Sequence, residues 1–358
     1  MNEKTYQSRM MRALRRESVD CTPIWMMRQA GRYMAEYREV RGKTTFLDLC
    51  RNPRQCAEVM LTAVERLGVD AAIIFADLLP ILREMGLDLE FQPGEGPVIH
   101  RPLREVADID RLREWEDPHA MEYVYETVRL TRAGLSETLP VIGFAGAPFT
   151  LASYAIEGGG SRNYLWTKKW MYTDSGAWNT ILGRLSRAIG EYLICQIQAG
   201  AEIVQLFDSW AGCLSVRDYR EYVLPYTQEV IRRVKEFSPQ TPVIHFATGN
   251  PMLLPAIRDA GGDCIGVDWR VELRDAWEMI GDDRAIQGNL DPAVLLTDLA
   301  TIRRHAWHVW KQAQGRKGHI FNLGHGIFKE TPVENAVELV KMVHDFGSDG
   351  ETFSQTVS

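Results

Sequence analysis

Short apolar runs recur along the chain, and each ends in small or polar residues. They lack strict alternation of apolar and polar positions, which is typical of strands that helices cover on both faces of a parallel sheet. We therefore predict eight parallel strands. The runs are "TPIWMM" (22–27), "AAIIFA" (71–76), "PVIGFAG" (140–146), "EIVQLFD" (202–208), "PVIHFA" (242–247), "CIGVDW" (264–269), "RAIQGN" (284–289) and "HIFNLG" (319–324).

Most of these runs are followed by a segment with helical periodicity. Residues 53–67 are the clearest case, because Asn52 can cap the helix, Pro53 fits its first turn and apolar residues recur on one face. From the fourth run onward the spacing is about that of a βα unit. Further helices are expected over 216–237, 251–260, 273–280, 292–314 and 332–346, the last with Thr331 as its N-cap.

Eight such units predict an α/β fold, a (β/α)8 TIM barrel that forms a single domain over residues 1–347 with an N-terminal extension. The main insertion follows the second run, where "LEFQPGEGPVIHRPL" predicts a hairpin that turns at Gly94 and Gly96. Residues 348–358 are expected to be a disordered tail. An open, doubly wound sheet is the competing architecture, because counting strands does not separate the two.

Charge is distributed unevenly along the chain. The formal net charge is −7, which argues against a general nucleic-acid binder. The first 60 residues nevertheless carry twelve Lys and Arg against seven Asp and Glu, a net charge of +5, and the other 298 residues carry −12. This asymmetry indicates a local anion site near the N-terminus, although solvated surface charges also explain most of these residues.

The six cysteines are scattered without a C-x-x-C pair, so we expect reduced thiols in a cytoplasmic protein and no bound metal. The N-terminus lacks the apolar core of a secretory signal. No apolar stretch reaches the roughly 20 residues that cross a bilayer, so we expect no membrane association.

In a barrel, function lies at the C-terminal ends of the strands. Arg28 directly follows the first run. Its permanent charge requires a carboxylate or a phosphate as partner if the side chain is buried. Asp77 ends the second run in an apolar context, where an unpaired charge costs several kcal/mol. It therefore caps a helix, pairs with an arginine, or awaits a cationic or N–H-rich ligand. Arg32 and Glu36 are four residues apart, so a helix-surface ion pair is the alternative for Arg32.

The glycine-rich stretch 143–161 could cradle a phosphate, but it has neither the G-x-x-x-x-G-K-[ST] order nor the G-x-G-x-x-G spacing of nucleotide-binding loops. Tyr154 within this stretch is either a core residue or a site hydroxyl. His325 follows the eighth run and is flanked by glycines, where a ligand can approach the backbone closely. A structural histidine is the alternative interpretation.

Six motifs in series resemble the uroporphyrinogen decarboxylase family from Arg12 to Phe346. The resemblance implies a homodimeric (β/α)8 barrel of heme and tetrapyrrole biosynthesis. Such a carboxy-lyase needs no cofactor, and it converts the four acetate side chains of uroporphyrinogen III to the methyl groups of coproporphyrinogen III. The motifs are "PIWMMRQAGRYMAEYREVR", "AAIIFADLL", "GFAGAPFTLASYAIEGGGS", "LFDSWAG", "QGNLDP" and "FNLGHGI".

The resemblance also implies site residues. Asp77 matches the aspartate that gathers the pyrrole N–H groups, and its charge can stabilise the pyrrole cation formed when a ring carbon is protonated. Arg28 is our candidate for delivering that proton, with His325 and a water molecule as alternatives. The remaining substrate contacts implied are Arg28, Gln29, Ala30, Gly31 and Arg32 for the carboxylates, Tyr154, Ser209 and His325 as polar groups, and Phe207 as an apolar wall.

Two other functions stay open at this point. Cobalamin-linked methyltransferases of related fold need a zinc-held thiolate, typically from an H-x-C pair at a strand end. The corresponding run here reads His245-Phe246-Ala247, without the thiol. A non-catalytic tetrapyrrole carrier is the second alternative, and the retained Asp77 argues against it.

Overall fold

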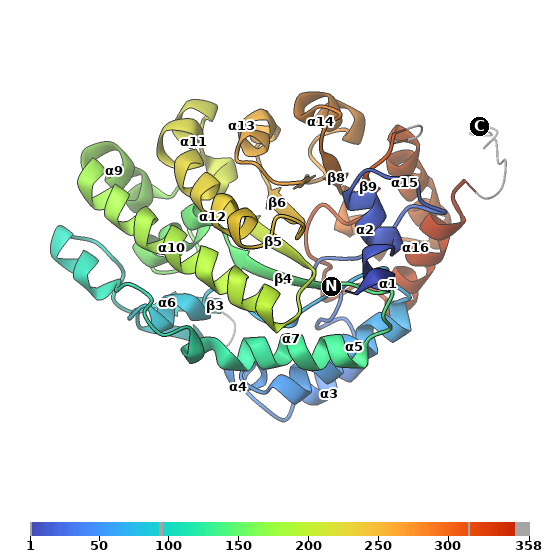
Figure 1. Ribbon diagram of the computed structural model, residues 1–358, viewed down its shortest axis with the longest axis horizontal. Coiled ribbons are helices and arrows are strands. Elements are labelled where there is room, and N and C mark those ends of the chain that lie inside the picture. The colour runs from blue at the N-terminus through green and yellow to red at the C-terminus, as the bar shows by residue number, and fades with distance from the viewer. Residues whose placement is uncertain (1, 93–95, 314–315, 348–358) are drawn as a thin grey trace.

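The computed structural model describes residues 2–92, 96–313 and 316–347. At its centre lies a curled parallel sheet of seven strands, whose order β1-β4-β5-β6-β7-β8-β9 follows the chain (Figure 1). A doubly wound sheet reverses its strand order, so this topology contradicts that alternative. The strands are β1 (Ala72–Ile73), β4 (Val141–Gly146), β5 (Ile203–Asp208), β6 (Val243–Ala247), β7 (Cys264–Gly266), β8 (Ala285–Gln287) and β9 (His319–Ile320).

The first predicted strand, 22–27, takes the eighth position without forming a regular ladder. Ile24 forms an isolated parallel bridge with Phe321, and the Phe321 N–H donates to the Pro23 carbonyl at 2.8 Å. On the other side the Asp70 N–H donates to the Ile24 carbonyl at 2.8 Å. The ladder is cut short because Pro23 has no N–H and the Ile24 N–H donates to the Asp70 carboxylate instead. The segment thus joins both edges of the curled sheet, as the predicted barrel requires.

Helices surround this sheet (Figure 1). Two of the predicted helices, 53–67 and 273–280, have the expected bounds, and Asn52 caps the first by accepting from the Gln55 N–H. The α-helices are α1 (Glu3–Tyr6), α2 (Arg9–Leu14), α3 (Ala35–Arg41), α4 (Phe46–Cys50), α5 (Pro53–Leu67), α6 (Pro80–Glu84), α7 (Glu122–Gly134), α8 (Pro148–Glu157), α9 (Leu165–Thr173), α10 (Ser175–Ala199), α11 (Val216–Tyr222), α12 (Leu224–Phe237), α13 (Leu254–Asp259), α14 (Leu273–Ile280), α15 (Leu299–Gln312) and α16 (Val333–Asp345).

The other predicted helices need correction. The segment 216–237 breaks at Val223, because Pro225 fits the first turn of α12 but cannot continue α11. Thr331 does not cap α16, which begins after Pro332. The segments 251–260 and 292–314 each begin as a short 3₁₀ helix before the α-helix starts. The 3₁₀ helices are η1 (Val106–Arg111), η2 (Pro118–Met121), η3 (Ala211–Cys213), η4 (Pro251–Leu253) and η5 (Pro292–Leu296).

The insertion after β1 carries the expected hairpin. Strands β2 (Leu89–Gln92) and β3 (Gly96–Ile99) pair antiparallel. Gly96 has a φ of 87°, which favours glycine. Gly94 and the predicted tail 348–358 lie outside the described residues.

The interior of the barrel is filled. The Trp25 indole N–H donates to the Gln287 side chain at 2.9 Å, and Gln287 donates in turn to Gln205 on the far side of the ring at 3.2 Å. Above this buried layer, the Phe207 ring lies 5.5 Å from that of Phe144 and 5.9 Å from that of Phe246. A ligand therefore cannot pass through the barrel, and a site must lie at one of its ends.

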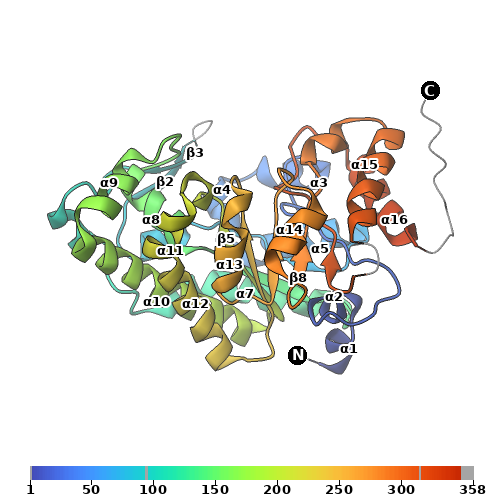
Figure 2. The ribbon, with the colours of Figure 1, turned by 90° about the horizontal axis from the view of Figure 1, so that it is seen from above.

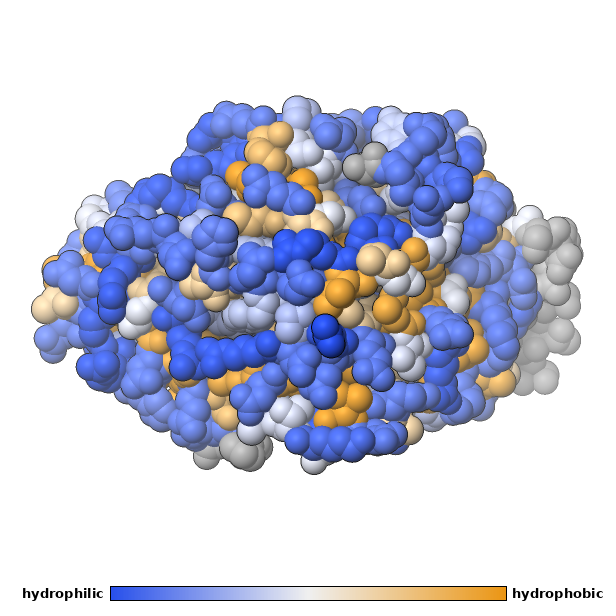
Figure 3. Space-filling model, turned by 60° about the horizontal axis from the view of Figure 1, so that its bottom comes forward, coloured by the Kyte–Doolittle hydropathy of each residue, from blue (hydrophilic) through white to orange (hydrophobic). Residues whose placement is uncertain are grey.

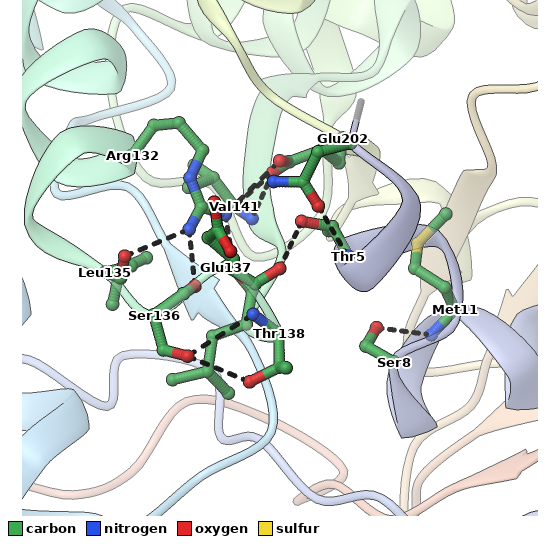
Figure 4. A network of polar contacts seen from close by, with 12 residues as sticks. Thr5, Ser8, Met11, Arg132, Leu135, Ser136, Glu137, Thr138, Val141 and Glu202 are labelled. Carbon is green, nitrogen blue, oxygen red and sulfur yellow. Dashed lines mark hydrogen bonds and ion pairs between the residues drawn. The ribbon is translucent and has the colours of Figure 1, made fainter.

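The N-terminal ends of β4 and β5 are tied together by a polar network (Figure 4). Glu202 is buried, accepts from the Val141 N–H at 2.8 Å and pairs with Arg132. The Thr5 hydroxyl donates to the Glu137 carbonyl at 2.6 Å, which holds α1 against the same loop. Helices α1 and α2 lie at the end of the barrel opposite the β2–β3 hairpin (Figure 2).

Hydrophilic side chains cover most of the face shown in Figure 3, and apolar ones are scattered between them. Among the described residues, no helix is both long and apolar enough to span a bilayer.

Candidate active site

A rigid turn presents Arg28 at the C-terminal end of the barrel. Arg28 has a φ of 63°, an unusual conformation for a residue with a side chain. The buried Gln29 side chain fixes this turn, because it accepts from the Met26 N–H at 3.2 Å and donates to the Ala71 carbonyl at 3.0 Å. A β-carbon at Gly31 would lie 2.9 Å from the Arg28 carbonyl oxygen. The backbone of Arg28 is thus held by the residues that follow it, and its side chain is exposed.

The glycines on both sides of His325 make room for neighbouring side chains. A β-carbon at Gly326 would lie 2.4 Å from Cδ of Arg28, and one at Gly324 would lie 2.5 Å from the backbone nitrogen of Trp269. At Gly324 the clash is with backbone, so this position requires glycine, whereas a β-carbon at Gly326 would displace the exposed side chain of Arg28. The "GHG" sequence therefore brings Arg28 and Trp269 to opposite sides of His325.

Asp77 lies half-buried after β1, where its carboxylate accepts from the Leu79 N–H at 2.9 Å. Burial raises the pKa of Asp77 to about 6, although the Leu79 N–H and the charge of Arg28 act in the opposite direction. Burial also raises the pKa of Tyr154 to about 12, and the Asp77 charge contributes to this. At neutral pH the site thus combines an ionised Asp77, a cationic Arg28 and a protonated Tyr154.

His325 is half-buried, and its ring lies 6.4 Å from that of Trp269 in an edge-to-face arrangement. Burial lowers its pKa below the usual value, and the charges of Arg28 and Arg270 lower it further. His325 is therefore neutral at physiological pH. It can donate or accept a hydrogen bond, but it does not carry the charge of an imidazolium acid.

A cavity of about 430 Å³ opens at this end of the barrel. It includes the predicted site residues Ser209 and His325, and Tyr154 stacks on the ring of Trp210 with centroids 3.7 Å apart. Phe207 is half-buried and, like Arg28, Asp77 and Tyr154, is not among the residues that line this cavity. The cavity is lined by Tyr164, Ser209, Trp210, Gly212, Cys213, Thr248, Gly249, Trp269, Arg270, His325 and Phe328.

Several of these lining residues were not predicted as site residues. Trp210 and Trp269 directly follow Ser209 and Asp268 at strand ends. This position next to strand ends is the feature of the sequence that indicates a place in the site. Arg270 comes one residue later. Tyr164 precedes α9 with a φ of 52°, and nothing in its sequence context indicates the cavity.

The remaining predicted residues lie on the Arg28 turn. Arg32 is exposed and precedes α3, and its possible partner Glu36 pairs with Arg66 instead. The contacts of Gln29 are within the protein, and Ala30 is buried. The structure thus places the exposed side chains of Arg28 and Arg32 on one turn and gives the buried Gln29 a role in shaping it.

The charged and polar groups at this end of the barrel are of the kinds that suit an anionic ligand with N–H donors. The arginines can bind carboxylates, and the Asp77 carboxylate can accept N–H groups or stabilise positive charge in a partly desolvated environment. Aromatic rings of Tyr154, Trp210 and Trp269 offer flat apolar surfaces beside these charges.

Comparison with known proteins gives a consistent result. The family model "Uroporphyrinogen decarboxylase (URO-D)" matches residues 5–346. The chain is 52% identical over 338 residues to a uroporphyrinogen decarboxylase of Koribacter versatilis, covering 94% of this chain and 96% of that protein. It is also 52% identical to a protein of that name from Sorangium cellulosum, covering 94% and 95%.

Among solved structures, a methyltransferase from Methanosarcina mazei superposes with a TM-score of 0.82 at 20% sequence identity, covering 96% of this chain and 99% of that one. At this identity the likeness shows a shared fold. The family match and the curated relatives span nearly the whole chain, and it belongs to the uroporphyrinogen decarboxylase family.

Proposed function

We propose that this chain removes CO2 from the four acetate side chains of uroporphyrinogen III and yields coproporphyrinogen III. The observation that carries the proposal is the ionised, half-buried Asp77 beside Arg28 at the C-terminal end of the barrel. The substrate carries eight carboxylates and four pyrrole N–H groups, so it presents the partners that both side chains require. The curated relatives of that name support the same reaction.

The proposed chemistry uses the substrate itself as electron sink. A proton adds to the ring carbon adjacent to the one that bears the acetate, and the pyrrole becomes cationic. The C–C bond to the carboxylate then breaks, its electron pair moves into the ring and CO2 leaves. The exocyclic methylene takes up a proton to become a methyl group as the ring carbon gives up its own. One proton is consumed for each CO2 released, and no cofactor is needed.

Asp77 is assigned the transition-state role. Its negative charge stabilises the pyrrole cation more than the neutral substrate, which is the differential binding that accelerates a reaction. Its position in a partly desolvated site strengthens this interaction relative to water. The arginines can also hold the propionates of the product, so holding carboxylates is not in itself catalysis.

Arg28 is our candidate for proton delivery, because its charge acts directly on Asp77. His325 is neutral at physiological pH, which makes it a weaker acid than an imidazolium. A water molecule held by either side chain is the third source. Replacing Arg28 by Lys keeps a cation and changes its geometry, so a loss of kcat with intact binding supports a direct role.

We further propose that the protein is a cytoplasmic homodimer. The six cysteines are free thiols, which suits a reducing compartment. Helix α9 exposes Leu165, Trp166 and Tyr172 next to the Tyr164 wall of the cavity, and exposed apolar groups of this kind favour association. Light scattering of the purified protein measures this state directly.

A cobalamin-linked methyltransferase is the alternative. Ala247 occupies the position where that chemistry needs a thiolate, and the described residues contain no group of three metal-ligating side chains. EDTA-treated protein with full decarboxylase activity excludes this alternative, and formation of product excludes a non-catalytic carrier.

The decisive experiment is an anaerobic incubation of EDTA-treated protein with uroporphyrinogen III, followed by chromatography of the oxidised porphyrins. We expect porphyrins with seven to four carboxyl groups, and their absence contradicts the proposal. Asp77→Asn should keep the fold and lose most turnover. Asp282→Asn, which changes a carboxylate that is 85% exposed, is the matched control and should behave like the unmodified protein.

A further inference from the structure

One charged side chain of the cavity has no part in the functions proposed above. Arg270 lines the cavity together with His325 and Thr248, and its charge acts on His325. Arg28, in contrast, is the arginine whose charge acts on Asp77. Arg270 thus acts on His325 but is not among the charges that act on Asp77.

Asp268 fixes the position of Arg270. One carboxylate oxygen of Asp268 accepts from Nη1 of Arg270 at 2.5 Å, from the Thr248 hydroxyl at 2.6 Å and from the Gly249 N–H at 2.7 Å. Its other oxygen accepts from the Arg270 backbone N–H at 2.9 Å. Asp268 is only 4% exposed, so this carboxylate is saturated within the protein and anchors the arginine without competing for a ligand in the cavity.

The loop that carries Arg270 is rigid. The guanidinium carbon lies 4.1 Å above the ring of Trp269. The backbone of Trp269 packs against Gly324, and the Asn289 amide donates to the carbonyls of Asp268 and Val271 at 2.8 and 2.7 Å. A cation held in this way loses little conformational entropy when it binds a ligand.

The guanidinium retains donors for a ligand. Among the described residues, its hydrogen bonds to protein all involve Nη1, which contacts Asp268 and Thr248. The Nε and Nη2 groups form the other edge of the planar fork, and the side chain is 45% exposed. Two adjacent N–H donors match the two oxygens of a carboxylate.

We propose that Arg270 binds a substrate carboxylate at the cavity and sets the affinity for highly carboxylated porphyrinogens. This inference rests on the proposed function. Because Arg270 is not among the charges that act on Asp77, we expect it to interact equally with the bound substrate and the transition state. It therefore lowers KM without raising kcat.

The test compares Arg270→Gln, Arg270→Lys and, as matched control, Arg274→Gln. Arg274 is an exposed arginine on α14 outside the cavity. We expect Arg270→Gln to raise KM for uroporphyrinogen III about tenfold, the scale of one charge-assisted hydrogen bond, with kcat changed less than about twofold. The KM of Arg270→Lys should lie between those of Arg270→Gln and the unmodified protein. Arg274→Gln should match the unmodified protein.

Other results overturn this inference. An unchanged KM in Arg270→Gln, or a lower kcat at constant KM, contradicts binding of a carboxylate by Arg270. Circular dichroism and thermal unfolding establish that each variant is folded, and the folded Arg270→Lys variant provides the same test if Arg270→Gln is unstable. If the unmodified protein forms no product, the proposed function fails instead, so the two failures are distinct.

Inhibition by coproporphyrinogen III identifies which carboxylate is bound. This product retains the propionates and has lost the acetates. If Arg270 binds a propionate, the inhibition constant rises by the same factor as KM in Arg270→Gln. If it binds an acetate, product inhibition stays unchanged while KM rises. A product constant that rises without any rise in KM contradicts the proposal.

Discussion

The pKa of Asp77 predicts how activity depends on pH. Its carboxylate must be ionised to stabilise a pyrrole cation, and its pKa is raised to about 6. About 90% of the molecules carry the charge at pH 7 and about 10% at pH 5, so kcat/KM should fall about tenfold over this interval. An aspartate with an ordinary pKa near 3.9 would lose less than about 10% of its charge over the same range.

The assay is the initial rate of CO2 loss under anaerobic conditions at substrate concentrations below KM, from pH 5 to pH 8. Two other side chains need controls. His325→Gln removes the histidine next to Arg28, and Asp208→Asn removes a buried carboxyl whose pKa burial raises to about 7. The acidic limb should persist in both variants. A flat profile between pH 7 and pH 5, or a limb that disappears in either variant, refutes the assignment to Asp77.

The same pKa makes a second prediction, about stability. Because the pKa of Asp77 is higher in the folded state, ionised Asp77 destabilises the fold at pH values above about 6, by about 3 kcal/mol for a shift of about two units. Asp77→Asn removes that cost, so the variant should unfold at higher urea concentration than the unmodified protein at pH 8. The difference should shrink as the pH falls from 6 towards 4. A less stable variant at pH 8 contradicts the argument.

Two further predictions test neighbouring features. Gly326→Ala places a β-carbon 2.4 Å from Cδ of Arg28, so we expect at least a tenfold loss of kcat/KM in a folded protein, whereas Gly160→Ala, where nothing lies within 4 Å, should be silent. Burial lowers the pKa of His245 to about 4, so His245 is neutral in the folded protein near neutral pH. Because the unfolded state binds this proton more readily, stability should be lost as the pH falls from 6.5 towards 4. His245→Leu should weaken this acid sensitivity, as measured by urea unfolding at pH 7.5 and 5; an unchanged pH dependence contradicts this.

Much of the fold could be predicted because apolar runs and their spacing report local structure. Seven of the eight predicted strands contain strands of the sheet, and the chain-order topology agrees with the barrel. The exception, 22–27, failed because its hydrogen bonds go to the side chain of Asp70 and to the edge at Phe321, which only the tertiary structure brings together. The break at Val223 has a local signal in the sequence, because Pro225 marks the start of a new helix.

The site was predictable only in part, and for a physical reason. Asp77 and His325 directly follow two of the predicted strand runs, so the barrel hypothesis is enough to place them at one end. Arg270 and Tyr164 reach the cavity through loops whose course depends on packing, such as the contact of Trp269 with Gly324. Position after a strand identifies the groups close to the barrel axis, but it does not identify the walls that loops build around them.

The arrangement of charges around His325 implies that the substrate changes the acid chemistry of its own site. In the free protein Arg28 and Arg270 both lower the pKa of His325. Carboxylates that bind these arginines neutralise this effect, so the pKa of His325 should rise when a porphyrinogen binds. NMR titration of the histidine protons with and without coproporphyrinogen III measures this shift, and His325→Gln assigns the signal. A rise favours His325 as a proton donor in the complex, whereas an unchanged pKa leaves Arg28 or water to deliver the proton.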